Sequence, residues 1–512
     1  MKISKQCLAP LFCTAVCAVA AYSGAAPWLR VWLGALTLAT VAWAMIWGKV
    51  LAVPAEALLV VWCIPWSMHF LRLMYFGHIW PEYPLFYLLG FLASYLIGFY
   101  FPIIRREEEA SRSRPGAPFL DGSGLREWQW IYDLCAISGF ICALAAVMSG
   151  FALTGGNYSD LSQVRQAFLT ESVSKWDYLV VLTSPPGVVA FVVGLLYQEY
   201  LGAFRRLVYI LAGLCTVVAG VAHAGRYTAV QIVILTLICA AIRRKNHLRP
   251  LGDARLTILM GAILTVLAAY MLIMPYFRDS TATSDFAELA VSAAGVEVDP
   301  GLSQTVSAQA PAVRDVLYAS YVYLAMPLEN FRIFYSVYSD SPKLGALEGS
   351  VVVHQLSRIF PQIESPTDIL MDRGQEYANV GEPPTSWQTM ASYMVIDFGW
   401  VGCLVLIGAL GNFSRFMYDS AVAAHSVPAT LALAALCFYP VHSIMYSALA
   451  SLDLLLLVLW GIVLRMIGGK NPIRRAPFID RAAGLRATGS APAISRQIPN
   501  PKPQTDERPT EC

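Results

Sequence analysis

The stretch of sequence that decides the fold is RLVYILAGLCTVVAGVAHAGRYTAVQIVILTLICAAIRRK, residues 206–245. It holds two long apolar runs that are separated by a short turn around Gly225 and Arg226, and it ends in three consecutive bases. A helix needs about 20 mostly apolar residues to cross the hydrocarbon of a bilayer, where it must satisfy its own backbone polar groups. The stretch therefore predicts two antiparallel transmembrane helices joined at the membrane surface.

The composition extends this prediction to the whole chain of 512 residues. Apolar residues make up 57% of the chain and charged residues only 14%, against about 25% charged residues in a typical soluble domain. A soluble enzyme, a secreted disulfide scaffold, a nucleic-acid-binding protein and a disordered chain are therefore excluded. We predict an all-α polytopic integral membrane protein. Its transmembrane helices, about 12 of them, are expected at 7–25, 28–47, 52–72, 83–104, 129–151, 178–197, 206–223, 226–242, 256–275, 388–411, 428–448 and 451–468.

The distribution of basic residues predicts the orientation of these spans. With the N-terminus inside, 25 of the 36 lysines and arginines fall in inside segments and 11 fall in outside segments, which is the excess expected of cytoplasmic loops. Both termini are then cytoplasmic. The first span has a second interpretation as a cleaved signal peptide, because Lys2 and Lys5 precede it. We favour a retained helix because the second span follows almost at once.

The loops divide the chain into four parts. Spans one to nine form a membrane domain over 1–275, and spans ten to twelve form a second one over 388–468. Between them, 276–387 is a large outer loop, in which apolar residues recur every three or four positions over 313–338 and predict an amphipathic helix. The tail, 469–512, is rich in Pro, Arg and Ala without apolar periodicity, and we expect it to be a disordered cytoplasmic segment.

Motifs for several other chemistries are missing from the sequence. It has no Walker-type Gly-Lys-Ser/Thr loop, no His-Glu-x-x-His and no Cys-x-x-Cys, so neither ATP-driven transport nor a zinc site is supported. We expect no metal and no cofactor. The pair Pro185-Pro186 interrupts the sixth span and hints at the broken helices of a transporter, but the sequence shows no matching break and no internal repeat.

Arg226 is placed at the outer membrane surface by the short turn between spans seven and eight, with His223 and Tyr227 on either side of it. An arginine at this depth is costly unless it reaches the interface or meets an anion. Because a guanidinium forms bidentate hydrogen bonds with phosphate, Arg226 is a candidate phosphate ligand. An interfacial anchor is the alternative interpretation.

The helix expected over 313–338 carries Glu329 and Arg332 together with several tyrosines, of which Tyr321 and Tyr335 belong to its apolar stripe. Aromatic rings stack on sugar faces and arginines hold phosphates, so this pattern suits a sugar linked to a diphosphate. The alternative is an aromatic belt at the membrane interface.

Four further ionisable residues are candidates on the outer side. His354 follows an apolar patch in the large loop, and an imidazole serves as a general base near neutral pH; a structural histidine is the alternative. Asp397, His442 and Asp453 lie in the outer halves of spans ten to twelve. Ionisable groups at membrane depth are functional candidates, and the alternative is a polar contact between helices.

Two local stretches carry a resemblance to a known family. Ala224-Gly225-Arg226-Tyr227 has a small-residue-Arg element at the outer start of a helix. Thr385 lies at the entry to span ten, which continues as Asp397-Phe398-Gly399-Trp400-Val401-Gly402. These stretches, the many spans and the large late outer loop resemble the bacterial O-antigen polymerase family, to which the O-antigen ligases are related. The ligase-type His-Asn pair is missing, which favours a polymerase.

The resemblance implies a reaction and its partners. Two undecaprenyl-diphosphate-linked oligosaccharides meet at the periplasmic face of the bacterial inner membrane, and the growing chain is transferred to the new repeat unit of an O-antigen, capsule or exopolysaccharide. Arginine stabilises the leaving diphosphate without a metal. A flippase and a chain-length regulator are possible partners besides the bilayer, and no nucleic acid is expected. The expected diphosphate ligands are Arg226, Arg278, Arg332 and Arg358. The expected catalytic residues are Arg226, Glu329 and His354, of which Glu329 and His354 are the candidates for the base. The residues expected to contact sugar are Tyr227, Tyr321 and Tyr335.

Other classes remain open. A flippase or transporter for the same lipid-linked sugars predicts charged residues along a path through the bilayer, whereas the inner halves of the spans here carry few besides Glu56 and Asp133. An O-antigen ligase-like transferase shares the outer-face chemistry. A lipid-to-sugar glycosyltransferase of the larger outer-face class predicts an acidic motif in the first outer loop, which here is only a few residues around Pro27. A non-enzymatic envelope assembly protein is the remaining class.

Overall fold

The chain falls into two units, Met1–Arg465 and Met466–Cys512. The computed structural model describes residues of the first unit, namely 4–72, 74–76, 82–101, 125–126, 128–154, 175–222, 227–251, 258, 260–263, 265–266, 296–298, 311–338, 342–347, 350, 353, 356–357, 360, 362–379, 389–424, 427–444 and 458–459. The predicted spans 256–275 and 451–468 lie mostly outside these residues, and the predicted disordered tail 469–512 lies wholly outside them.

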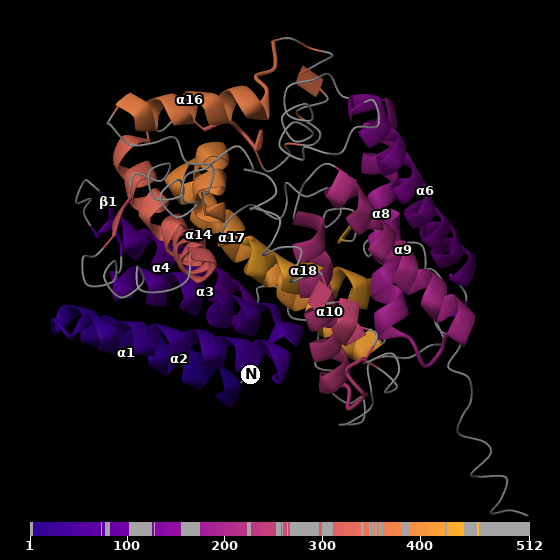
Figure 1. Ribbon diagram of the computed structural model, residues 1–512, viewed down its shortest axis with the longest axis horizontal. Coiled ribbons are helices and arrows are strands. Elements are labelled where there is room, and N and C mark those ends of the chain that lie inside the picture. Colours follow the sequence, from indigo (N-terminus) through magenta and orange to yellow (C-terminus); the bar gives the residue numbers. More distant parts are fainter. Residues whose placement is uncertain are drawn as a thin grey trace, which may run out of the picture. The chain divides into compact units, whose positions relative to one another are not determined.

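Helices make up almost all of the described part of the chain (Figure 1). They are α1 (Lys5–Tyr22), α2 (Pro27–Ile46), α3 (Pro54–Leu71), α4 (Pro84–Tyr100), α6 (Gln129–Thr154), α8 (Lys175–Leu196), α9 (Ala203–Ala222), α10 (Tyr227–Lys245), α14 (Pro311–Val337), α16 (Pro366–Asn379), α17 (Met390–Ala424) and α18 (Val427–His442). A 3-10 turn, η1 (Val50–Ala52), and two short strands, β1 (Met74–Phe76) and β2 (Val296–Val298), accompany them. Every predicted span except 256–275 and 451–468 coincides with one of these helices.

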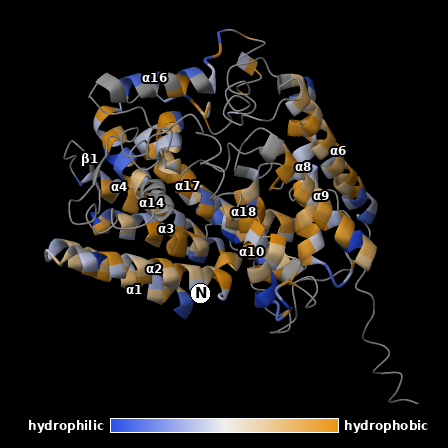
Figure 2. Ribbon diagram, in the orientation of Figure 1, coloured by the Kyte–Doolittle hydropathy of each residue, from blue (hydrophilic) through white to orange (hydrophobic). Residues whose placement is uncertain are grey.

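Within the described residues, 7 helices are long and apolar enough to cross a membrane. They lie in α1, α2, α3, α6, α8, α9 and α17, and the shorter helices α4 and α18 are also apolar. Figure 2 shows α6, α8 and α9 mostly in the hydrophobic colour. The chain is therefore an α-helical, multi-pass membrane protein.

Tryptophans mark both ends of α2. Trp28 and Trp32 near its start and Trp43 and Trp47 near its end are all exposed. The 20 residues of this helix extend over about 30 Å at 1.5 Å per residue, which matches the hydrocarbon thickness of a bilayer. Because tryptophan is enriched at the two membrane interfaces, α2 has the length and the end residues of a helix that faces lipid.

α3 is the most enclosed of the N-terminal helices. It packs against α1, α2, α14 and α18, and side chains on all its faces are buried, as expected for a helix that is apolar all round. It ends at Arg72, whose backbone is left-handed with φ 49 and ψ 45 and whose N–H donates to the carbonyl of His69. A left-handed residue at this position stops the helix and turns the chain away.

α4 and α17 pack through glycine. A Cβ atom at Gly98 would lie 2.0 Å from the carbonyl oxygen of Gly408, so the two backbones touch, as small residues allow in membrane helices. The Tyr95 hydroxyl donates to Ser414 Oγ at 2.9 Å across the same contact. The pairing therefore depends on the absence of a side chain at Gly98.

Two helices differ from their predicted course. α8 passes through Pro185 and Pro186 as one continuous helix, so the expected interruption of the sixth span is wrong. α17 is instead interrupted at Gly399, whose φ of 71 and ψ of 174 are non-helical, a conformation that glycine adopts far more readily than other residues. α17 also continues past the predicted end of its span, where Arg415 Nε donates to Asp419 Oδ2 at 2.7 Å and supports the helix at i,i+4 spacing.

α6, α8 and α9 form a second closely packed group. A Cβ atom at Gly139 would lie 2.5 Å from the carbonyl oxygen of Ala212, and one at Gly213 would lie 2.2 Å from the Cβ atom of Phe191. Glycines therefore bring α9 into backbone contact with α6 and against the side chain of α8.

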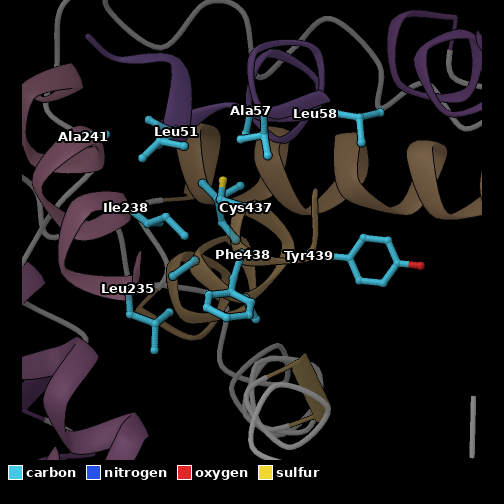
Figure 3. Close-up of a cluster of buried hydrophobic side chains, with 14 of the residues drawn as sticks. Leu51, Ala57, Leu58, Leu235, Ile238, Ala241, Cys437, Phe438 and Tyr439 are labelled. Atoms are coloured by element: carbon cyan, nitrogen blue, oxygen red, sulfur yellow. The ribbon is translucent and has the colours of Figure 1, made fainter. Parts of the chain in front are cut away.

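α10 and α18 connect this group to α3. α10 contacts α8, α9, η1 and α18, and α18 in turn contacts α3. Figure 3 shows the buried side chains of Leu51, Ala57, Ile238, Cys437 and Phe438 gathered where η1, α3, α10 and α18 meet. The centre of this junction is apolar.

The segment 276–387 contributes two helices, α14 and α16, and the strand β2 to the fold. α14 covers the positions for which the residue spacing predicts a helix, and it packs against α3, α4 and α16. β1, which follows α3, pairs antiparallel with β2, with Met74 opposite Val298 and Phe76 opposite Val296. Two segments that are far apart in the sequence and that are both predicted to lie outside therefore meet over the end of α3.

Candidate functional site

α14 brings two charged side chains against the end of α3. His69 Nδ1 lies 2.5 Å from Glu329 Oε1, and Arg332 Nη1 donates to Glu329 Oε2 at 2.6 Å. The three side chains are 4%, 14% and 10% exposed, in the order His69, Glu329 and Arg332. Both oxygens of one carboxylate therefore face nitrogen atoms in a site that is largely closed to solvent.

A second ion pair lies beside the first, at the turn after α3. Arg72 Nη2 lies 2.6 Å from Glu82 Oε1, and the Tyr22 hydroxyl donates to Glu82 Oε2 at 2.7 Å. The guanidinium of Arg72 also lies over the Tyr22 ring, 5.5 Å from its centroid. The left-handed backbone of Arg72 is uncommon for a residue other than glycine and aims this side chain at Glu82. We refer to Tyr22, His69, Arg72, Glu82, Glu329 and Arg332 as the ion cluster.

The carboxylates of the ion cluster are held in their ionised form. Burial opposes ionisation of Glu329, but the hydrogen bond with His69 and the charge of Arg332 outweigh it and hold the pKa of this carboxyl below its ordinary value. For Glu82, burial likewise acts against the charge, and the Tyr22 hydrogen bond and the Arg72 charge bring its pKa below the ordinary value. Both effects are those expected of a carboxylate that accepts hydrogen bonds beside cations.

Aromatic side chains continue the site along α14. Tyr335 and Trp400 have ring centroids 4.6 Å apart, and Tyr87 lies edge-on to Trp400 at 4.9 Å. Tyr87 stacks on Phe331 at 6.0 Å, and Tyr83 meets Tyr335 at 5.6 Å. We call Tyr83, Tyr87, Phe331, Tyr335 and Trp400 the aromatic group; because Phe331 and Tyr335 share α14 with Glu329 and Arg332, the aromatic group and the ion cluster are neighbours.

The interruption of α17 holds Asp397 in a separate contact. The break at Gly399 frees the carbonyls of the preceding turn, and the backbone N–H groups of Lys343 and Leu344 donate to Ile396 O at 2.9 Å and to Asp397 O at 2.8 Å. The Asp397 carboxylate is buried and accepts the N–H of Leu347 at 3.0 Å. This aspartate therefore fastens the segment 343–347 to the broken helix, which is a structural role.

The structure describes half of the site residues that are predicted from the sequence. Glu329, Arg332 and Tyr335 come together as given above, whereas Tyr321 uses its hydroxyl to donate to the carbonyl of Met68 at 2.8 Å. His442 ends α18 with its ring stacked on Phe438 at 5.5 Å. The remaining nominated residues, Arg226, Arg278, His354, Arg358 and Asp453, lie outside the described residues, and of Tyr227 only the backbone is described.

The sequence interpretation missed four members of the ion cluster, Tyr22, His69, Arg72 and Glu82. The signal that was available is the position of His69 near the outer end of an apolar span, because an ionisable side chain at membrane depth is a functional candidate. Nothing in the sequence indicates that this histidine meets a glutamate 260 positions later. Among the described residues, no group of three or more His, Cys, Asp and Glu side chains is placed to hold a metal ion.

The fold and the site together define a multi-pass α-helical membrane protein in which a cluster of ion pairs lies where α14 meets the end of α3. Comparison of the chain with protein-family models, with curated proteins and with solved structures finds no match.

Proposed function

We propose that this protein polymerises undecaprenyl-diphosphate-linked oligosaccharide repeat units at the periplasmic face of a bacterial inner membrane. One observation carries the proposal: the ion cluster lies beside the aromatic group, where α14 meets the end of α3. A donor made of sugar, diphosphate and lipid needs aromatic faces, cations and a membrane-embedded helix in one place. The proposal also rests on the resemblance of two sequence stretches to the O-antigen polymerases.

The proposed topology has about 12 spans, with both termini in the cytoplasm and 276–387 outside. The contacts between helix ends support it, because ends that are assigned to the same side lie together. On the inner side, the N–H of Ser4 donates to Glu56 Oε1 at 3.2 Å, and Arg244 Nη1 donates to the carbonyl of Gly48 at 3.1 Å. On the outer side, α14 and β2 meet the end of α3 and β1.

In the proposed reaction the arginines bind the diphosphate. Arg226 is the principal ligand, and Arg278, Arg332 and Arg358 support it; a guanidinium offers a fork of donors to phosphate oxygens and stabilises the charge that develops as the diphosphate leaves. The aromatic group, with Tyr335 at its centre, offers ring faces and edges to the sugars. The activity proposed is that of a metal-independent glycosyltransferase, and a flippase and a chain-length regulator are its proposed partners.

A flippase or transporter for the same lipid-linked sugars is the second candidate, because the break in α17 at Gly399 resembles the discontinuous helices of transporters. Two observations favour the polymerase. The segment 343–347 occupies the free carbonyls of the break, and the junction of η1, α3, α10 and α18 is filled by apolar side chains (Figure 3).

The test is the length distribution of the glycan made by the source organism. Cells that carry Arg226→Ala in place of the native protein are expected to make single repeat units in place of long chains, because the diphosphate loses its principal ligand. Arg205→Ala, at an exposed ion pair with Asp133 on the predicted inner side, is the matched control and should leave the ladder of chain lengths intact. An unchanged ladder in Arg226→Ala refutes the assignment of Arg226.

A further inference from the structure

We propose that His69 is the general base of the transfer reaction and that Glu329 positions it. This inference rests on the proposed function and assigns the proton-accepting group, for which the sequence nominates Glu329 and His354. His69 is a candidate for the general base because it forms a histidine–carboxylate pair, in which Nδ1 lies 2.5 Å from Glu329 Oε1.

The hydrogen bonds determine which ring nitrogen carries the proton. Glu329 faces His69 with one oxygen and accepts from Arg332 with the other at 2.6 Å, so its carboxylate is ionised and acts only as an acceptor. Nδ1 of His69 must then be the donor. In the neutral ring the lone pair is consequently on Nε2. The hydrogen bond of this ring to Glu329 uses Nδ1.

Glu329 itself is poorly suited to accept the proton. Its two oxygens are both engaged, and the neighbouring His69 and Arg332 hold its pKa below the ordinary value, which weakens it as a base. The same contacts suit it to a positioning role, since a carboxylate on Nδ1 fixes the tautomer and orientation of a histidine and stabilises the imidazolium that forms when Nε2 accepts a proton.

The surrounding charges fit an acid–base residue beside a diphosphate. The groups that face His69 are Glu329 and Arg332 from α14 and, from the turn after α3, Glu82 with its partner Arg72. Each of the two carboxylates near the histidine is therefore paired with an arginine, Glu329 with Arg332 and Glu82 with Arg72. A leaving diphosphate that approaches this cluster meets cations next to the group that removes the acceptor proton.

The step balances without a metal or a redox partner. The hydroxyl oxygen of the acceptor sugar forms a bond with the anomeric carbon of the donor sugar, and the hydroxyl proton moves to Nε2 of His69. The bond between the anomeric carbon and the phosphate oxygen breaks, and its electron pair leaves with undecaprenyl diphosphate. The imidazolium, held by Glu329, later releases the proton to water.

The experiment uses the full-length protein in lipid nanodiscs. Its substrate is the undecaprenyl-diphosphate-linked repeat unit extracted from a deletion strain of the source organism, which accumulates single units if the proposed function holds. His69→Gln is expected to lower kcat by about 10²–10⁴-fold, the usual contribution of a general base, with KM within about threefold of the native value. Tyr95→Phe removes a buried hydrogen bond between α4 and α17 that involves no member of the ion cluster or the aromatic group, and it should keep the native kcat.

The outcomes separate the base from the function. If the native protein makes a ladder and His69→Gln makes it at the native rate, the base assignment is overturned and the proposed function stands. If the deletion strain accumulates no single units and the native protein makes no ladder, both are overturned. If His69→Gln fails to fold, Glu329→Gln is measured in its place, because the amide oxygen of glutamine still accepts a hydrogen bond from Nδ1. A loss of kcat of about tenfold to hundredfold with native KM supports the positioning role of Glu329. A native kcat overturns that role.

Discussion

Replacement of Glu329 by alanine tests whether the ion cluster holds α14 on α3. The side chains of His69 and Arg332 are 4% and 10% exposed, so the substitution removes the carboxylate from beside two nitrogen-bearing groups that solvent barely reaches. The neighbouring pair offers a control in the same region: Arg72 and Glu82 are 40% and 39% exposed. The two glutamates thus differ in burial, both in their own, 14% exposed against 39%, and in that of their partners.

The burial of the partners decides the magnitude. Removing one partner of a buried ion pair costs about 3–5 kcal/mol because the other charge stays behind in a poorly solvated place. An exposed pair contributes about 0–1 kcal/mol because water and salt screen it. We therefore expect Glu329→Ala to lower the free energy of unfolding by several times the loss caused by Glu82→Ala.

The assay is denaturant-induced unfolding of the purified protein in detergent micelles, followed by tryptophan fluorescence. Native protein, Glu329→Ala and Glu82→Ala are compared at one ionic strength, and again at high salt, where the small Glu82→Ala effect should shrink further. Equal losses for the two variants would refute the reasoning, because they would mean that burial of His69 and Arg332 does not set the strength of the contact.

Three further outcomes are expected. Gly98→Ala should lower the unfolding temperature, because its Cβ would lie 2.0 Å from the carbonyl oxygen of Gly408. Gly90→Ala on the same helix, where a Cβ would have nothing within 4 Å, should leave the unfolding temperature unchanged or raise it. Equal effects of the two substitutions would contradict the packing of α4 on α17. Gly399→Ala should cost about 1–3 kcal/mol of stability, because the φ of 71 at this break strains any side chain, and a denaturant titration that shows no loss would be evidence against the break. The pKa of Glu329 is lowered from 4.5 in the folded protein, so its stabilising contribution is complete above about pH 4.5 and is lost as the pH falls through the lower folded value. The difference in unfolding temperature between native protein and Glu329→Gln should therefore shrink below about pH 4.5. A difference that grows at lower pH would contradict the direction of this pKa shift.

Hydropathy and spacing predict the helices well because these properties depend on near neighbours in the chain. α2 begins and ends within one residue of its predicted span, and the predicted helix over 313–338 corresponds to α14. The errors have local causes. α17 continues beyond its predicted end because a helix does not stop where apolar residues stop. α8 continues through Pro185-Pro186 because a membrane helix tolerates proline where neighbours satisfy the freed carbonyls.

The candidate site is much less predictable, because it depends on contacts between distant positions. Arg332 and Glu329 are three residues apart and their pairing follows from helix geometry. The contact of Glu329 with His69 joins residues that are 260 positions apart in the sequence, and no local sequence pattern predicts it. The Asp-Phe-Gly stretch at 397–399 is part of the resemblance to the O-antigen polymerases. In the structure, Gly399 breaks α17 and the Asp397 carboxylate accepts a hydrogen bond from the segment 343–347.

The most direct test of the central claim is reconstitution. The full-length protein in proteoliposomes is given undecaprenyl-diphosphate-linked repeat units from the deletion strain, and the products are separated by gel electrophoresis. The proposed function predicts a ladder that grows by one repeat unit per rung, with release of undecaprenyl diphosphate and without added metal. Single units that stay single, or that only change their side of the membrane, would contradict it.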